Sequence, residues 1–177
     1  MKLEIEDKWF NEEEMENTPR RFKGFLDEWL KNSGDFKFTT FENPGYDEII
    51  IWSGYDLFSM CSHHLLPIII QEIHIGYIPN DKICGLSKIP RVVNYFAHRP
   101  QIQERMTQQI VDYMVEHLDP KGVICTVKAR HLCMEARGIR EKGSTMTTSA
   151  VRGVFLKPEP GKSPKEEFFE LIKSVRV

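Results

Sequence analysis

The sequence predicts an α+β protein with one main domain, and three observations carry this prediction. Short runs rich in Ile, Phe, Tyr and Trp, broken by Pro and Gly, are typical of strands. These runs are residues 36–41, 48–60 and 68–78. Residues 87–97 and 101–118 repeat their apolar residues at helical spacing, which predicts two amphipathic helices. Residues 122–133 alternate with a period of two, as expected of a strand with one face in the core.

The segment before these elements predicts a helix over residues 9–31. Thr18 suits an N-cap and Pro19 the first helical position. The apolar residues at helical spacing are Phe22, Phe25, Leu26, Trp29 and Leu30. We expect this amphipathic helix to need a partner surface.

The central elements have recognisable boundaries. Ser87 suits the N-cap of the helix that ends before Pro100, and the helix that follows stops at residues 119–122, Asp-Pro-Lys-Gly. In the strand 122–133, Val123, Cys125, Val127 and Ala129 share one face with His131 and Cys133. His131 and Cys133 are therefore expected to continue the core face of that strand.

The carboxyl-terminal part predicts one more strand and one more helix. The strand covers about 146–156 and follows a Gly-Ser-Thr turn. Residues 157–164, KPEPGKSP, read as a linker. Ser163, Pro164 and Glu166 form a capping-box pattern with Pro at the first helical position, which predicts a terminal helix over 164–174.

Length, composition and charge exclude several classes of protein. A chain of 177 residues is near the usual size of one domain and can bury a core. No apolar run approaches the ~20 residues of a membrane span, and a net charge of −2 gives no basic field for nucleic acid. The acidic amino terminus lacks the pattern of a secretory signal, so we expect a cytoplasmic protein. In a reducing compartment its four cysteines are thiols or metal ligands rather than disulfides.

The segment CSHHLL, residues 61–66, predicts a metal site. Cys61 and His64 are three residues apart, so a tight turn directs both side chains to one point, as Zn²⁺ requires of its ligands. Cys133 can complete the set from a distant strand. Two buried thiols are a common alternative, but the nearby His63 and His131 favour a metal. Spacing alone leaves open whether four protein donors close the site or water takes the fourth position.

Four long motifs resemble the GTP cyclohydrolase I family. They are Asn17-Thr18-Pro19-Arg20-Arg21, residues 77–110 (YIPNDKICGLSKIPRVVNYFAHRPQIQERMTQQI), residues 131–140 (HLCMEARGIR) and residues 144–155 (STMTTSAVRGVF). The resemblance implies a T-fold, in which an antiparallel sheet is backed by two helices. It also implies a homo-oligomeric barrel, usually a decamer of two pentamers, with active sites at subunit interfaces. The chain then divides into a helical extension (1–34), a catalytic domain (35–157) and a linker with a terminal helix (158–177).

The resemblance also implies a reaction and the residues at its centre. Cys61, His64 and Cys133 match the family's zinc ligands, and His63 and His131 match its two catalytic histidines. Water activated by the zinc ion attacks C8 of GTP, and imidazoles shuttle the protons. The family releases C8 as formate and closes the product to 7,8-dihydroneopterin triphosphate, the first step of pterin and tetrahydrofolate biosynthesis.

Further positions match the family's substrate-binding residues. Glu104, with Gln103 beside it, matches the carboxylate that accepts two hydrogen bonds from guanine. Ser87 matches a residue near the ribose and phosphates. The cations that match the triphosphate binders are Lys88, Arg91 and Arg137, with Arg21 supplied by another subunit. Taken singly, each cation is more often a solvated surface charge, Glu104 a helix first-turn acid, and Ser87 an N-cap.

One departure from the family pattern keeps two alternatives open. Ser62 stands where the family usually has Glu, and loss of that carboxylate can alter how a neighbouring imidazole is oriented. The alternatives are another purine- or pterin-pathway enzyme on the same fold, and a non-catalytic assembly module stabilised by zinc. A mononuclear base deaminase is disfavoured, because its H-x-E and P-C-x-x-C pair is absent from the sequence.

Overall fold

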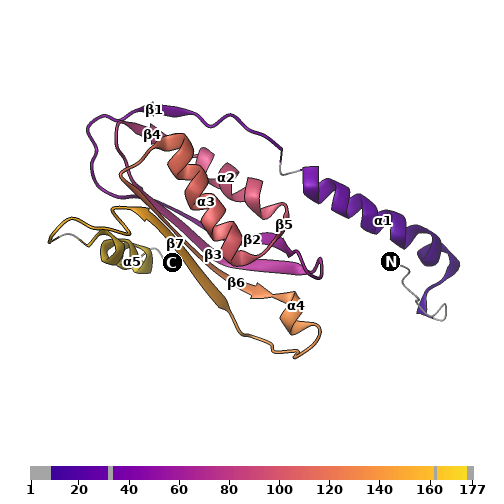
Figure 1. Cartoon of the computed structure of the whole chain (residues 1–177). Coiled ribbons are helices and arrows are strands. Elements are labelled where there is room, and N and C mark those ends of the chain that lie inside the picture. The colour runs from indigo at the N-terminus through magenta and orange to yellow at the C-terminus, as the bar shows by residue number, and fades with distance from the viewer. Residues whose placement is uncertain (1–8, 32–33, 162, 175–177) are drawn as a thin grey trace.

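The computed structural model describes residues 9–31, 34–161 and 163–174, and Figure 1 shows a twisted sheet with helices on both faces. Parts of the two predicted extensions, residues 1–8, 32–33, 162 and 175–177, lie outside the described residues. The helices are α1 (Glu12–Lys31), α2 (Lys88–Ala97), α3 (Gln103–Leu118), α4 (Leu132–Glu135) and α5 (Pro164–Ser174). The strands are β1 (Thr40–Glu42), β2 (Ile50–Cys61), β3 (Pro67–Ile78), β4 (Lys82–Cys84), β5 (Pro100–Gln101), β6 (Gly122–His131) and β7 (Met146–Gly153).

The main sheet has the order β5-β2-β3-β6-β7, and its four long strands are antiparallel. Because side chains alternate along a strand, one face of the sheet is rich in apolar side chains, and α2 and α3 cover it (Figure 1). The buried stripe of α3 is Met106, Ile110, Met114 and Leu118. The α+β class is confirmed, and a sheet backed by two helices is the arrangement expected of a T-fold.

The terminal helix α5 lies against the opposite face of the sheet (Figure 1). Phe168 is fully buried there and packs with Ile124 of β6 and Phe155. Gly76 of β3 permits this contact, since a Cβ atom at that position would lie 2.7 Å from Cδ2 of Phe168. The predicted helix over 164–174 is therefore confirmed, and its apolar residues have a docking site.

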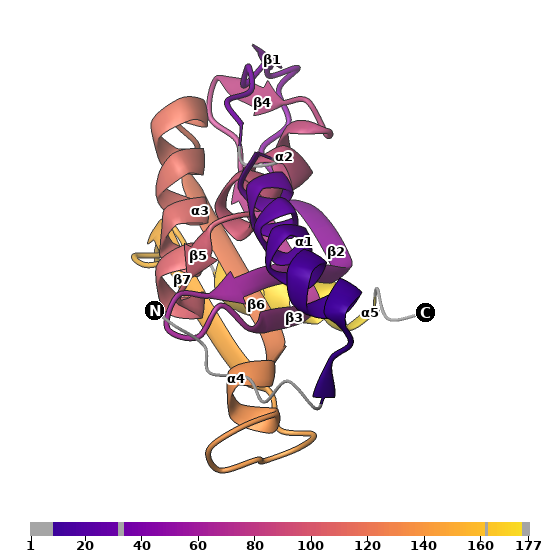
Figure 2. The same cartoon turned by 90° about the vertical axis from the view of Figure 1, so that its right-hand side faces the viewer.

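The amino-terminal helix differs from its prediction at one end. It begins at Glu12, so Thr18 is not its N-cap and Pro19 lies inside it. The cap forms earlier, where the backbone N–H of Glu14 donates to Asn11 Oδ1 and the N–H of Asn11 donates to Glu14, both at 2.9 Å. No described residue of α1 is buried, and the helix extends away from the sheet (Figures 1 and 2). Its carboxyl-terminal end contacts the body through the rings of Trp29 and His98.

Two further expectations are corrected locally. The predicted strand 36–41 is reduced to β1, which pairs with β4, because the rings of Phe36 and Phe38 pack on Tyr113 of α3 instead. Ser87 precedes α2 as expected but makes no side-chain cap hydrogen bond. Among the described residues, no helix has the length and apolar character needed to cross a bilayer.

Candidate metal centre and active site

Cys61 and His64 are brought together by a tight turn at the end of β2. Cys61 is the last residue of that strand, and the backbone N–H of Leu65 donates to the Cys61 carbonyl at 2.9 Å. Leu65 has a φ of 53°, an uncommon value for a residue with a branched side chain. The turn directs the imidazole of His64 back towards the thiol, as the three-residue spacing predicts.

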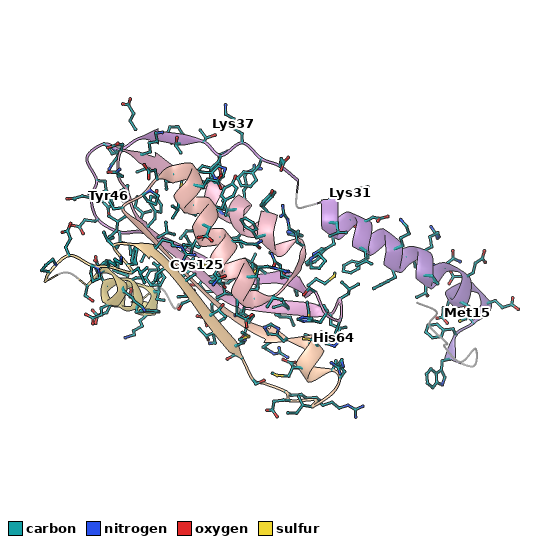
Figure 3. All side chains as sticks on the ribbon, in the orientation of Figure 1. Met15, Lys31, Lys37, Tyr46, His64 and Cys125 are labelled. Atoms are coloured by element: carbon teal, nitrogen blue, oxygen red, sulfur yellow. The ribbon has the colours of Figure 1, made fainter. Side chains whose placement is uncertain are left out.

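Cys133 reaches the same point from the end of β6, which lies two strands away from β2 in the sheet, but it is not on a strand. β6 ends at His131, and Cys133 lies in the short helix α4. The change of conformation is held by Arg130, which donates to both carboxylate oxygens of Glu135 at 2.8 and 2.6 Å. His131 pairs with Ile68 of β3, so the end of β6 lies beside the Cys61–His64 turn. In Figure 3, His64 lies next to the α4 ribbon.

The three side chains form a site suited to a metal ion. One ligand atom from each of Cys61, His64 and Cys133 lies within 4.8 Å of the other two, and Cys61 Sγ is 3.9 Å from His64 Nδ1. Ligand atoms of a tetrahedral zinc site lie about 3.5–4 Å apart, so a small closure completes the geometry. Burial raises the pKa of the Cys133 thiol, and so do its hydrogen bond to Cys61 and the negative charge that Cys61 carries as a thiolate. A bound cation offsets this cost by stabilising the thiolate.

Two more histidines border the metal group. His63 is exposed, and its Nδ1 lies 3.7 Å from Cys61 Sγ. His131 is half-buried, and burial lowers the pKa of its imidazole, while the charges of Glu104 and Glu135 act in the opposite direction. A lowered pKa favours the neutral imidazole, which can accept a proton and return it. The site thus holds one imidazole open to solvent and one partly shielded from it.

The first turn of α3 supplies the next pair of residues. Gln103 is 1% exposed, and its Oε1 lies 2.7 Å from Nε2 of His131. Glu104 is exposed beside it, and its charge reaches His131. Exposed Arg137 follows α4 and has Nη1 2.8 Å from Nε2 of His64. A carboxylate and a guanidinium therefore flank the metal group, as required for a ligand with an amidine edge and phosphates.

The backbone joins the metal turn to this helix. Cys61 pairs with Gln101 of β5, and the N–H of Ser62 donates to the Gln101 carbonyl at 2.9 Å. α3 begins two residues later at Gln103. The Ser62 position is thus fixed by its main chain, whichever side chain it carries.

The other predicted binding residues lie at a distance within one chain. The carboxyl end of α2 is near the site, since Ser59 Oγ donates to the Ala97 carbonyl at 2.8 Å. Lys88 is the first residue of this ten-residue helix, so its backbone lies about 14 Å from that of Ala97 at the other end. Ser87 directly precedes the helix, and Arg91 lies at the end of its first turn. Arg21 is on α1, where it forms an ion pair with Glu13. One chain therefore assembles the metal group without these four residues.

Sequence reasoning missed three residues that support the site. The Arg130–Glu135 pair follows the strand that carries His131, and a basic and an acidic residue five apart give no distinctive signal. Thr148 lies beneath Gln103, with its Oγ1 3.1 Å from Gln103 Nε2. The period-two pattern of β7 places Thr148 on the same face as Ala150, towards α3, and this could have identified it.

Comparison with known proteins gives a consistent result. The family model described as GTP cyclohydrolase I matches residues 2–173. GTP cyclohydrolase 1 of Campylobacter jejuni (strain RM1221) is 43% identical over 170 residues, covering 94% of this chain and 87% of the relative. The protein of the same name from Aquifex aeolicus (strain VF5) is 43% identical over 164 residues, covering 92% and 86%.

A likeness to a solved structure is weaker. The archaeosine synthase QueF-Like in its apo form is 17% identical, covers 63% of this chain and 97% of its own, and gives a TM-score of 0.46. The family match covers nearly the whole chain, and the curated relatives agree with it. The chain therefore belongs to the GTP cyclohydrolase I family of enzymes.

Proposed function

We propose that the protein hydrolyses GTP to formate and 7,8-dihydroneopterin triphosphate at a zinc site formed by Cys61, His64 and Cys133. One observation carries the proposal: donor atoms from two segments about 70 residues apart converge within 4.8 Å, with His63 and His131 beside them. The family assignment supports GTP as the substrate and a role in folate biosynthesis. Zinc, when bound, supplies the Lewis acidity for attack of water on C8 of the guanine ring.

Two histidines of the protein, His63 and His131, transfer the protons. His63, exposed at the turn, exchanges protons with solvent and with the ribose oxygen as the ring opens. His131, whose pKa is lowered by partial burial, exchanges a proton with the purine nitrogen. Each imidazole has two ring nitrogens, so it can take up a proton at one step and release it at another.

Binding of the substrate uses charge at three places. Glu104 accepts hydrogen bonds from N1–H and the exocyclic amine of guanine. Arg137, next to His64, contacts the triphosphate, and Lys88, Arg91 and Ser87 complete the phosphate and ribose contacts from a neighbouring subunit. Support for a neighbouring subunit comes from the roughly 14 Å that separates the start of α2 from its end near Cys61.

A homo-oligomer with shared sites follows from this arrangement. The proposed assembly is a barrel-shaped decamer of two pentamers, to which Arg21 on the extending α1 also contributes. Mixing His63→Ala chains with Lys88→Ala chains tests this point: hybrid oligomers regain activity if each site combines two chains. Inactive hybrids with normal assembly would argue that each chain carries its own Lys88. The cytoplasmic location expected from the sequence stays a prediction.

The central experiment incubates zinc-loaded protein with GTP and measures formate and the fluorescent pterin formed by oxidation of the product. His63→Ala is expected to abolish turnover and to retain zinc, while His117→Ala, on the outer helix α3, serves as the matched control. GTP binding without formate release would favour a different reaction on the same fold. Loss of zinc in His63→Ala would overturn the assignment of ligand and proton donor.

A further inference from the structure

The orientation of the buried Gln103 amide is determined by its surroundings. Its nitrogen lies 3.0 Å from the Val127 carbonyl, 3.1 Å from the Met146 carbonyl and 3.1 Å from Thr148 Oγ1. Backbone carbonyls only accept hydrogen bonds, so the NH₂ group must occupy this end of the amide. The side-chain oxygen of Gln103 therefore faces His131. If the amide were flipped, this oxygen would face the carbonyl oxygens of Val127 and Met146, and no hydrogen bond could form between them.

A chain of hydroxyl groups confirms the same direction. Thr107 Oγ1 lies 2.8 Å from the backbone carbonyl oxygen of Gln103 and must donate its proton to it, because that oxygen only accepts. Thr148 Oγ1 lies 2.7 Å from Thr107 Oγ1, so Thr148 must donate to Thr107. The lone pairs of Thr148 are then free to accept from Gln103. Every proton in this loop has one allowed place, and both threonines belong to buried or half-buried parts of α3 and β7.

The consequence falls on His131. Its Nε2 lies 2.7 Å from Gln103 Oε1, which can only accept, so Nε2 carries a proton. In a neutral imidazole the second nitrogen is then bare. We propose that Gln103 is a positioning residue that holds His131 in the Nε2–H form, so that His131 exchanges protons with the substrate at Nδ1 alone. This inference rests on the proposed function for its catalytic meaning, and it gives Gln103 a task other than contact with guanine.

The alternative is that Gln103 merely ties α3 to β6 and β7. Three substitutions separate the two roles. Gln103→Met removes both the acceptor and the donors. Gln103→Glu keeps an acceptor for His131 but sets a carboxylate against two carbonyls, so it destabilises the fold more than Met does. Thr148→Val removes one partner of the amide and leaves both carbonyls to orient it.

The test is nitrogen NMR of His131 in the zinc-loaded full-length protein, at a pH above the pKa of the ring, with the signal assigned by its loss in His131→Asn. Wild type and Thr148→Val are expected to show the proton on Nε2, and Gln103→Met a mixture of both tautomers. kcat of Gln103→Met should fall by about 10-fold or more with little change in KM, as expected when proton transfer is impaired. Gln103→Glu should retain the Nε2 proton and a higher kcat than Gln103→Met, although it unfolds at lower temperature.

Several results would overturn the proposal. A wild-type protein with the proton on Nδ1 contradicts it directly, and so does Gln103→Met with an unchanged tautomer. Activity that follows stability across the three variants would show that Gln103 is only structural. If Gln103→Glu does not fold, the spectrum of Gln103→Met decides alone. The spectra require no GTP, so a wild type that releases no formate would refute the proposed function and leave the tautomer result standing.

Discussion

The contact between α5 and the sheet gives a prediction that can be worked out from distances. At Gly76, a Cβ atom would lie 2.7 Å from Cδ2 and 3.0 Å from Cε2 of Phe168, and 3.1 Å from Cγ2 of Ile124. Carbon atoms in contact prefer about 3.5–4.0 Å, so Gly76→Ala must displace the ring of Phe168. In Phe168→Ala the same Cβ enters space that the ring has left. The two substitutions should therefore be strongly non-additive.

The expected magnitudes follow from burial. Phe168 is fully buried, and truncating such a ring to Ala costs about 3–5 kcal/mol of unfolding free energy. Overpacking by Gly76→Ala costs about 1–3 kcal/mol in the wild-type background. In the Phe168→Ala background it should cost much less, because the two closest contacts, both with the Phe168 ring, are gone and the Ile124 methyl group at 3.1 Å needs only a small shift. The interaction energy of the double-mutant cycle is then about 1–3 kcal/mol.

Urea unfolding of the four proteins at one protein concentration measures this cycle. Gly24→Ala is the matched control, because a Cβ at Gly24 on α1 meets nothing within 4 Å. It should stabilise α1 slightly, since Gly in a helix costs about 1 kcal/mol relative to Ala. The same cost for Gly76→Ala in both backgrounds would refute the packing of α5 on β3.

Three further predictions concern the metal group. Removal of zinc by a chelator should abolish GTP turnover but preserve the circular dichroism of the fold, because the core between the sheet and α2–α3 consists mainly of apolar side chains, with Cys61 one member among many and Cys133 packed against it. Unfolding of the metal-free protein would instead favour a zinc-stabilised module. Zinc affinity, measured against a competing dye, should fall as pH falls, because protons compete for the thiolates. Burial raises the pKa of Cys133, so the fall should begin at higher pH than for an ordinary thiol, and a pH-independent affinity would contradict the Cys ligands. Glu135→Gln should lower the pKa of His131 further, because the Glu135 charge opposes the effect of burial, and should weaken zinc binding by roughly 10-fold as α4 loosens; an NMR titration and the dye assay check both.

Elements with a long periodic pattern were predictable from the sequence. The helix predicted over 101–118 is Gln103–Leu118, and the strand predicted over 122–133 is Gly122–His131. Their apolar faces are set by burial against one core, which periodicity reports directly. Where tertiary contacts determine the secondary structure, the apolar periodicity of the sequence gives the wrong element. The period-two pattern continues through Cys133, yet the Arg130–Glu135 pair turns that segment into α4.

The site was predictable only in its local part. Cys61 and His64 follow from spacing, because a turn of four residues fixes both side chains. Glu104, Arg137 and the phosphate binders needed the family resemblance, since single charges have no periodic signature. The task of Gln103 appears only when the carbonyls of Val127 and Met146, 24 and 43 residues further along the chain, are seen around its amide. Contacts of such sequence separation leave no trace in a local pattern.

The junction between the metal turn and α3 has a consequence for engineering and for evolution. Cys61 pairs with Gln101, and Ser62 donates a backbone hydrogen bond to it. These contacts fix which side chains of α3 face the metal turn. One residue inserted between Gln101 and Gln103 would rotate every later side chain of α3 by about 100° around its axis. His131 would lose its amide partner, and the buried stripe Met106, Ile110, Met114 and Leu118 would turn away from the core. The length of this junction is thus constrained by the site and by the core together, and insertions or deletions between Gln101 and Gln103 should be poorly tolerated.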